Sequence, residues 1–137
     1  MRHFSKLNDS VELPARATKG SAGYDIIVTD GDTVFPGETV VFHTGLTVSM
    51  EPDEVLLIYP RSSIGIKRHL MLSNTTGVID SDYTEEIHMA LTNFGDETQV
   101  IKSGERVAQG IFMKYLVTTD DDTTDERNGG IGSTGNL

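Results

Sequence analysis

The apolar stretches of this chain are short, β-branched and regularly interrupted, and this pattern constrains its fold more than any other feature. Runs rich in Val, Ile, Thr and aromatic residues recur between turn-forming residues, and helix signals are scarce. The turn residues are Gly31-Asp32, Pro36-Gly37, Thr44-Gly45, Asn93-Phe94-Gly95-Asp96 and Ser103-Gly104. The expected strands are Ser5–Leu7, Tyr24–Val28, Glu38–Phe42, Leu46–Ser49, Glu54–Tyr59, Met71–Leu72, Ile87–Asn93, Thr98–Ile101 and Arg106–Leu116. Many short strands at regular spacing predict an all-β sandwich or barrel, with one or two helical turns after Arg61.

The bulk properties narrow the class of protein. The 137 residues favour one domain. The formal net charge of -10 argues against duplex nucleic acid as a partner, although a few placed cations or a divalent metal could still hold a small anion. The chain has no cysteine, which excludes disulfides and thiolate sites. It shows neither a signal-peptide pattern nor an apolar stretch long enough to cross a membrane, so we expect a cytoplasmic protein.

A polar turn between two β-type segments is the first candidate site. Residues 77–93 are predicted to form two short strands around a tight tip, because β-branched residues lead in and apolar residues alternate from Ile87 onward. The tip carries two carboxylates, a hydroxyl and a phenol, those of Asp80, Ser81, Asp82 and Tyr83. Such a hairpin can wall a small pocket and place one acid in it, although an ordinary acidic turn has the same composition.

A basic and hydroxyl-rich segment is the second candidate. A strand is expected to end at Pro60, and Arg61, Ser62 and Ser63 then stand at the start of the expected helical turn. A guanidinium fork, hydroxyl donors and the positive end of a helix all suit a phosphate oxygen. The alternative is a serine that caps the helix beside a solvated arginine.

Three further segments carry polar candidates. The small residues before Asp25 would let the backbone approach a partner closely, although a plain loop looks the same. Asn74 offers a donor and an acceptor, so it can pair with an amide-like base edge or simply make a turn. Gln109 stands among apolar neighbours, where a buried amide needs partners, whereas an exposed strand face is the default alternative.

The C-terminal segment differs in composition from the rest. Residues 118–125 are polar and acidic, so we expect a β-barrel domain over residues 1–117 and a mobile arm over residues 118–137. The run from Gly130 to Gly135 matches Gly-x-Gly-x-x-Gly, but it lacks the strand-then-helix context of a dinucleotide fold and the Lys of a Walker loop. Its backbone N–H groups could still wrap phosphates beside Arg127.

Two other chemistries find no support. The histidines have no paired metal-ligand spacing such as His-x-x-x-His, and are predicted to be surface or packing residues; they are His3, His43, His69 and His88. Neither Ser62 nor Ser63 has a base that the sequence identifies beside it, so a nucleophilic triad is not supported.

The order of these segments is more specific than any one of them. The chain carries Gly-Ser-Ala-Gly-Tyr-Asp (20–25), Pro-Arg-Ser-Ser-x-Gly-x-Lys (60–67), Gly-Val-Ile-Asp-Ser-Asp-Tyr (77–83), Gly-Glu-Arg-Val-Ala-Gln (104–109) and Arg-Asn-Gly-Gly-Ile-Gly-Ser-Thr-Gly (127–135). This succession resembles the five motifs of the trimeric dUTPases. The resemblance implies a distorted jelly-roll (β-clip) fold, a homotrimer with active sites shared by three chains, and Mg²⁺-assisted hydrolysis of dUTP to dUMP and pyrophosphate, which keeps uracil out of DNA.

The resemblance also implies roles for individual residues. Asp80 would activate the water that attacks the α-phosphorus, with Gln109 and Ser62 positioning the reacting groups. The residues implied to hold phosphates or to cover the substrate are Arg61, Ser62, Ser63, Arg127, Ile131, Gly132, Ser133 and Thr134. Those implied to hold the nucleoside are Asn74, Gly77, Val78, Ile79, Tyr83 and His88, with Tyr83 stacked under the deoxyribose. Asp25 would act through the water shell of Mg²⁺ rather than as a direct ligand.

The chain departs from the family pattern at three positions. Ile131 stands where an aromatic usually covers the uracil, which gives up ring stacking worth about 0.5–1.5 kcal/mol. Glu85 replaces a usual Gly, which demands a different turn or an outward side chain and adds charge near the site. Ser63 replaces another usual Gly and is a milder change. Such departures suit a divergent viral member, which would act in the host cytoplasm.

Other functions remain open on the sequence alone. A dCTP deaminase resembles this family in fold and carries an Arg-Ser-Ser motif, but it would need a Glu near the cytosine ring. A regulatory protein that senses dUTP and acts on an unknown protein partner is the alternative from another class, and Ile131 and Glu85 keep it open. A purely structural jelly-roll subunit would leave Asp80 and the Gly-rich tail unexplained.

Overall fold

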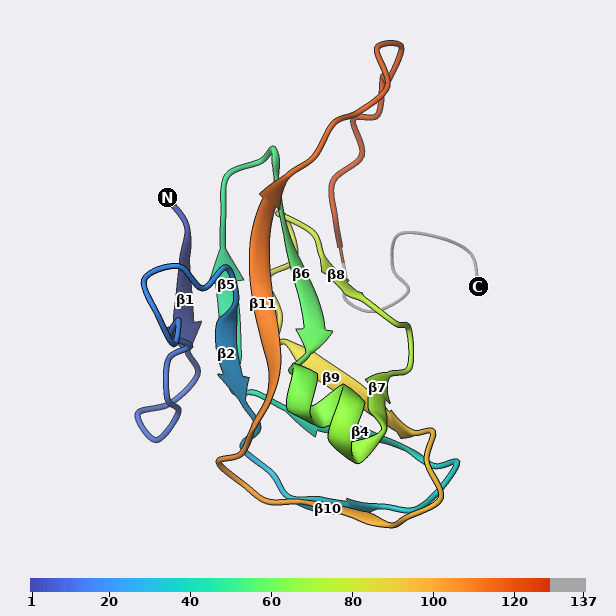
Figure 1. Cartoon of the computed structure of the whole chain (residues 1–137). Helices are drawn as coiled ribbons and strands as arrows, with labels where there is room; N and C mark the ends of the chain where they lie inside the picture. The colour runs from blue at the N-terminus through green and yellow to red at the C-terminus, as the bar shows by residue number, and fades with distance from the viewer. Residues whose placement is uncertain (129–137) are drawn as a thin grey trace.

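The fold consists of antiparallel strands and a single helical turn (Figure 1). The structure is a computed structural model, and it describes residues 1–128. The strands are β1 (His3–Lys6), β2 (Tyr24–Ile27), β3 (Asp32–Val34), β4 (Thr39–His43), β5 (Leu46–Ser49), β6 (Glu54–Pro60), β7 (Leu70–Leu72), β8 (Gly77–Ile79), β9 (His88–Asn93), β10 (Gln99–Ile101) and β11 (Arg106–Lys114). The helical turn, η1 (Ser63–Lys67), has π geometry and follows Arg61. The predicted all-β class is confirmed.

Two sheets dominate the fold and two strand pairs extend it. The larger sheet has the order β2-β11-β6-β8, and the second has the order β4-β9-β7. The pairs β1-β5 and β3-β10 stand as separate two-stranded sheets. All these pairings are antiparallel, and β11 runs between β2 and β6 as the central long strand (Figure 1). Gln109 on β11 is therefore held at a fixed register against both β2 and β6.

The core lies where both large sheets turn their alternate residues inward. Strand β9 alternates half-buried and buried positions along its whole length, as a strand with one core face must. Phe42 on β4 and Leu91 on β9 have no exposed surface, and Leu56 on β6 closes the core from the larger sheet. Each such side chain contributes about 1.5–3 kcal/mol through burial.

The expected hairpin over residues 77–93 is wrong. Strand β8 pairs with β6 at the edge of the larger sheet, whereas β9 pairs with β4 and β7 in the other sheet. Residues 80–87 are therefore a connection that crosses from one sheet to the other, not the tip of a hairpin. Residue alternation identified both strands correctly, but it carries no information about the partner of each strand.

The chain after β11 returns to the crossing connection. It leaves the upper end of β11 in Figure 1, turns back, and descends beside β8. Residues 115–128 contribute no strand or helix, and Arg127 meets Asp80 and Asp82. The division into a domain of residues 1–117 and an arm of residues 118–137 stays a prediction. In the part of the chain that the structure describes, no helix has the length and apolarity needed to cross a membrane.

Candidate functional site

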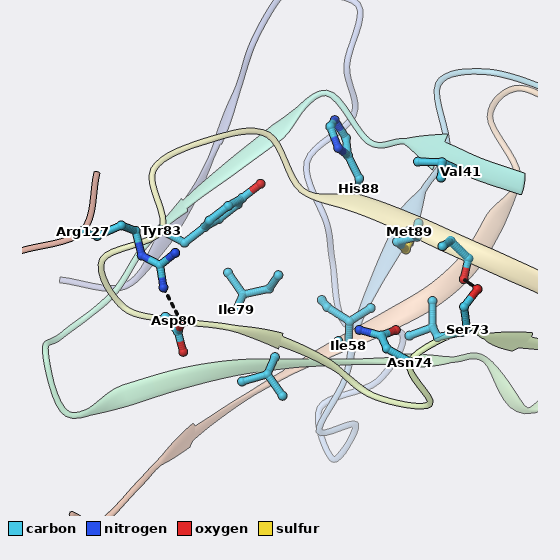
Figure 2. Close-up of a pocket in the computed structure, with 14 residues that line it drawn as sticks. Val41, Ile58, Ser73, Asn74, Ile79, Asp80, Tyr83, His88, Met89 and Arg127 are labelled. Carbon is cyan, nitrogen blue, oxygen red and sulfur yellow. Dashed lines mark hydrogen bonds and ion pairs between the residues drawn. The ribbon is translucent and has the colours of Figure 1, made fainter. Parts of the chain in front are cut away.

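A cavity of 410 Å³ opens between the crossing connection, β8 and the start of β9 (Figure 2). Its walls come from β4, β6, β8, β9, the turn after β7 and the returning chain. The lining residues are Val41, Ile58, Leu72, Ser73, Asn74, Gly77, Val78, Ile79, Asp80, Tyr83, His88, Met89, Ala90 and Arg127. Most of these are apolar, and the polar groups gather at the two ends, which is the usual character of a small-molecule site.

Asp80 and Arg127 define one end of the cavity (Figure 2). Asp80 directly follows β8, and its side chain is 49% exposed. Arg127 donates hydrogen bonds to the carboxylates of both Asp80 and Asp82, the latter at 2.7 Å. The hydrogen bond to Asp82 is the main reason that the pKa of Arg127 is raised, so this guanidinium stays charged. A carboxylate and a cation thus share the mouth of the cavity.

Tyr83 forms the wall beside that end. Its hydroxyl donates a 2.6 Å hydrogen bond to the carbonyl of Glu86, which fixes the ring across the crossing connection. Burial raises the pKa of the Tyr83 phenol, and the charges of Glu85 and Glu86 raise it further. The phenol therefore stays neutral, and the face of its ring is the part that is available to a ligand.

Asn74 lies at the other end, in the turn that follows β7 (Figure 2). The apolar floor between the two ends comes from Ile58, Ile79 and Met89. Gly77 lies opposite Ile58 in the β6–β8 pairing, and a Cβ on Gly77 would stand 3.0 Å from the Ile58 Cβ. A side chain at this position would press on the core, so glycine keeps β8 close to β6.

Asp25, Arg61 and Gln109 form a second group on the larger sheet. Asp25 and Gln109 are register partners across β2 and β11. Arg61 follows β6, and its Nε lies 3.6 Å from the Asp25 carboxylate. Ser62, at the N-cap of η1, is exposed and makes no capping hydrogen bond, so the alternative of a capping serine is not realised. A guanidinium and two hydroxyls, which can bind phosphate oxygens, therefore lie beside a carboxylate.

The close approach predicted for the glycines before Asp25 occurs within the chain itself. An added Cβ on Gly23 would lie 2.3 Å from the Gln109 Oε1 and 3.0 Å from the Gln109 Cβ. No side chain can occupy this position while Gln109 stays where it is. The glycine therefore holds open the space that the Gln109 amide fills.

The two groups do not meet within one chain. None of Asp25, Arg61, Ser62, Ser63 and Gln109 lines the 410 Å³ cavity. Arg61 and Ser63 instead border a separate hollow of 430 Å³ near η1. One chain alone therefore carries these residues on two separate surfaces, and the active site shared between chains that the resemblance implies stays a prediction. The expected site residues Ile131, Gly132, Ser133 and Thr134 lie outside the described residues.

By themselves, the two surfaces offer too few free oxygen ligands for a hard divalent cation. The side chain of Asp25 is 20% exposed and already faces Arg61, and Asp80 faces Arg127. A cation such as Mg²⁺ prefers several oxygen ligands and keeps waters, so a phosphate-bearing ligand would have to supply the remaining oxygens. The carboxylates fit an ion that arrives with such a ligand.

Sequence reasoning missed a cluster beside the cavity. His43 on β4 and His88 on β9 are register partners, and with Glu86 they place three ligand-type atoms within 4.8 Å of one another. A hydrogen bond to Asp30 raises the pKa of the His43 imidazole. Spacing along the chain finds histidines on one helix face, whereas a pair formed across two strands becomes visible only when the strand register is known.

Comparison with known proteins points to one family. The family model for dUTPase matches residues 9–135. A deoxyuridine 5'-triphosphate nucleotidohydrolase of Lactococcus lactis is 44% identical over 136 residues, which cover 93% of this chain and 91% of that protein. The crystal structure of a dUTPase from Streptococcus mutans superposes with a TM-score of 0.76 at 36% identity, over 85% of this chain and 98% of that one. A dUTPase from phage phi11 of S. aureus shares the fold, with a TM-score of 0.80 at 22% identity over 91% and 97% of the chains.

Proposed function

The chain belongs to the dUTPase family and is a dUTP diphosphatase with a small-molecule substrate, and from that premise we propose how its residues divide the hydrolysis of dUTP to dUMP and pyrophosphate. The observation that carries the proposal is the 410 Å³ cavity, which has a carboxylate at one end and an amide at the other. The cavity receives the nucleoside, and its charged end faces the phosphates. Its jelly-roll-like β fold is that of the related dUTPase structures.

The base enters the apolar part of the cavity. Asn74 pairs with the uracil edge through its donor and acceptor, together with the backbone of β8 and of His88. Ile58 and Met89 line the floor, and Gly77 holds β8 close to β6, so the space left for a substituent on the base is small. A tight backbone wall of this kind rejects a thymine methyl group by steric exclusion.

The sugar lies against Tyr83. The hydrogen bond from the Tyr83 hydroxyl to the Glu86 carbonyl fixes the ring, so the ring face becomes a rigid platform under the deoxyribose. A fixed platform leaves no room for a 2′-hydroxyl, because the ring cannot move away to admit one. Discrimination against UTP therefore rests on the same contact that orders the crossing connection.

Water activation falls to Asp80. The carboxylate stands at the mouth of the cavity, where the α-phosphate of a bound nucleotide would lie, and it accepts the proton of the attacking water. Arg127, which bonds Asp80 in the absence of substrate, turns to the phosphate oxygens when dUTP is bound. Hydrolysis of a polyphosphate depends mainly on positioning and on neutralised charge, which these two residues provide at one point.

Phosphate binding uses the second group of residues. Arg61 presents a guanidinium fork, and Ser62 and Ser63 add hydroxyl donors at the end of β6. Gln109 positions the α-phosphate and the water through its amide, and Gly23 keeps that amide in place. Gly132, Ser133 and Thr134, with Ile131 over the base, are proposed to complete the site from the segment outside the described residues.

The resident cation of this site is proposed to be Mg²⁺, held by the phosphates and, through water, by Asp25. When bound, Mg²⁺ neutralises phosphate charge and polarises the phosphoryl oxygens. Asp25 lies beside Arg61, so its carboxylate would hold the cation through water close to the phosphates. The same cation allows a chain of net charge -10 to bind a polyanion.

A homotrimer with shared sites explains why the two groups lie apart. The cavity of one chain would meet the surface formed by Asp25, Arg61 and Gln109 of a neighbouring chain. The segment that begins at Arg127 would close over the site where these two surfaces meet. Support comes from the incompleteness of each surface alone, since neither has the nucleoside pocket and the phosphate ligands together.

Pyrophosphate release tests the proposal. We expect dUTP to be hydrolysed with Mg²⁺, and dTTP, dCTP and UTP to react far more slowly. Asp80→Asn should lower kcat by about 100- to 10,000-fold, because the amide cannot take the proton. Asp96→Asn, an equal change of charge in the exposed turn after β9, is the control and should leave kcat unchanged.

Two results would count against the proposal, the first against the role of Asp80 and the second against the reaction. The first is a kcat for Asp80→Asn close to that of the Asp96→Asn control. The second is ammonia released from dCTP, which would establish the deaminase alternative. Tight dUTP binding without hydrolysis by the unsubstituted chain would instead favour the sensor.

A further inference from the structure

Two histidines face each other on the outer surface of the β4-β9-β7 sheet. His43 and His88 are register partners, and their neighbours Phe42 and Met89 point into the core. Opposite residues of an antiparallel pair leave the sheet on the same face, so both imidazoles lie outside. Their ring centroids are 4.7 Å apart and the rings stand at 75° to each other. Two ring nitrogens can therefore approach one point.

Glu86 adds a carboxylate to this pair. One of its oxygens, Oε1, lies 3.1 Å from the His88 Nε2, and the other accepts a 2.8 Å hydrogen bond from the Gly45 N–H. The backbone bond holds the carboxylate in place while its first oxygen faces the imidazoles. The three ligand atoms lie within 4.8 Å of one another, so small movements of the side chains bring them to one metal ion.

Asp30 orients the first imidazole from outside the cluster. Its Oδ2 lies 2.8 Å from the His43 Nδ1, and its Oδ1 accepts a 2.9 Å hydrogen bond from the His43 backbone N–H. This arrangement fixes the tautomer with the proton on Nδ1 and leaves the lone pair of Nε2 to coordinate a metal ion. A carboxylate behind a ligating histidine is a recurrent feature of metal sites, where it sets ring orientation and ligand basicity.

We propose that His43, Glu86 and His88 form a binding site for a divalent transition-metal ion of the zinc class. Two imidazoles and one carboxylate are a ligand set of Zn²⁺, with a water in the fourth position. Mg²⁺ prefers all-oxygen coordination, so this site is distinct in chemistry from a phosphate-held cation. The side chains of His43, Glu86 and His88 are 48%, 23% and 31% exposed, which leaves a path for the ion and its water.

The bound ion clamps the crossing connection to β4. Glu86 lies in that connection, and its carbonyl accepts the hydrogen bond from Tyr83 in the cavity wall. His88 lines the cavity itself. A metal that joins Glu86 and His88 to His43 therefore ties the wall of the cavity to a second strand, and it stabilises the folded state by binding that state alone.

Zinc titration of the full-length chain, without a histidine tag, tests the site. The chain is stripped with EDTA, moved to metal-free buffer at about pH 8 so that imidazoles are neutral, and titrated with Zn²⁺ by calorimetry. We expect one saturable site per chain. His43→Gln and Glu86→Gln should each weaken Zn²⁺ binding at least about tenfold. His3→Gln, on the exposed edge strand β1, is the matched control and should bind as the unsubstituted chain does.

Thermal unfolding measures Zn²⁺ binding in a second way. Saturating Zn²⁺ should raise the Tm of the unsubstituted chain and of His3→Gln, and should leave the Tm of His43→Gln unchanged. Equal concentrations of Mg²⁺ should not displace Zn²⁺. The proposal is overturned by the absence of a saturable site, by equal affinity in His43→Gln and the unsubstituted chain, or by a loss of affinity in His3→Gln, which would mark adventitious binding to a surface histidine.

Discussion

At the scale of single residues, Gly23 and Gln109 show how a backbone position serves a distant side chain. The Gln109 amide occupies the space in which a Cβ on residue 23 would stand, at 2.3 Å from its Oε1. The sequence indicated a close approach at this glycine, but it could not show whether the approaching group was a ligand or the chain's own glutamine. Residue 23 must be glycine because Gln109 fills the space that a Cβ at this position would occupy.

A prediction follows from this contact. Gly23→Ala should push the Gln109 side chain away from its position and lower kcat at least about tenfold, because the amide no longer positions the reacting groups. Steady-state kinetics with dUTP would measure the change. Gly20→Ala is the control, since nothing lies within 4 Å of its added Cβ, and it should keep full activity. Full activity in Gly23→Ala would remove Gln109 from the mechanism.

Glu85 illustrates what a family pattern can and cannot predict. A side chain at this position was expected to require a different turn or an outward orientation. In the structure Glu85 is exposed, and among residues 1–128 only His69 and Thr75 are non-glycine residues with positive φ. The side chain therefore points outward and the turn needs no left-handed residue. Its remaining effect is electrostatic, since its charge helps to raise the pKa of Tyr83.

At the scale of elements, sequence alternation predicted the strands but not their partners. The expected strands occur within two residues of their observed ends, and only the short β3 had no prediction. Pairing depends on contacts between distant segments, so β8 and β9 were wrongly joined in one hairpin. Asp80 and Tyr83 of the crossing connection nevertheless line one cavity, whereas Ser81 and Asp82 do not.

The end of β9 provides a prediction about stability. Asn93 is fully buried, and its amide donates to the Val34 and Glu97 carbonyls while its Oδ1 accepts from the Gly95 N–H. Asn93→Ala should lower the free energy of unfolding by about 2–3 kcal/mol, because buried backbone groups lose their partners. Denaturant unfolding measures this loss. Asn128→Ala, at an exposed position, serves as the control, and an equal effect in both variants would contradict the argument.

The returning segment after β11 provides the next prediction. Truncation after Asp125 removes Arg127, which contacts Asp80 and Asp82, and removes the Gly-rich motif. Because these groups are proposed to neutralise phosphate charge, kcat/KM for dUTP should fall at least about tenfold. The subunit assembly should persist, since none of the strands extends beyond Lys114 in the described chain. Unchanged kcat/KM would exclude the segment from the mechanism.

At the scale of the whole molecule, the described residues place the candidate site residues on two separate surfaces. The order of motifs was enough to identify the family and to predict the dUTPase reaction. The resemblance implied active sites shared between chains, but the motifs themselves could not show which residues line the nucleoside cavity and which lie apart from it with Arg61 and Gln109. Their separation is a property of the three-dimensional arrangement, and under the proposed function it would make the trimer necessary for catalysis.

Subunit mixing tests this central claim most directly. Asp80→Asn removes the proton acceptor of the cavity, and Arg61→Ala removes a phosphate ligand of the other surface, so each variant alone should be nearly inactive. Mixed trimers of the two variants, formed by co-expression, contain sites with an intact cavity from one chain and an intact surface from another. Random mixing should restore about one quarter of the sites. No recovery of dUTP hydrolysis, in mixtures shown by mass to contain both chains, would place both residues in the same chain's site and contradict the account.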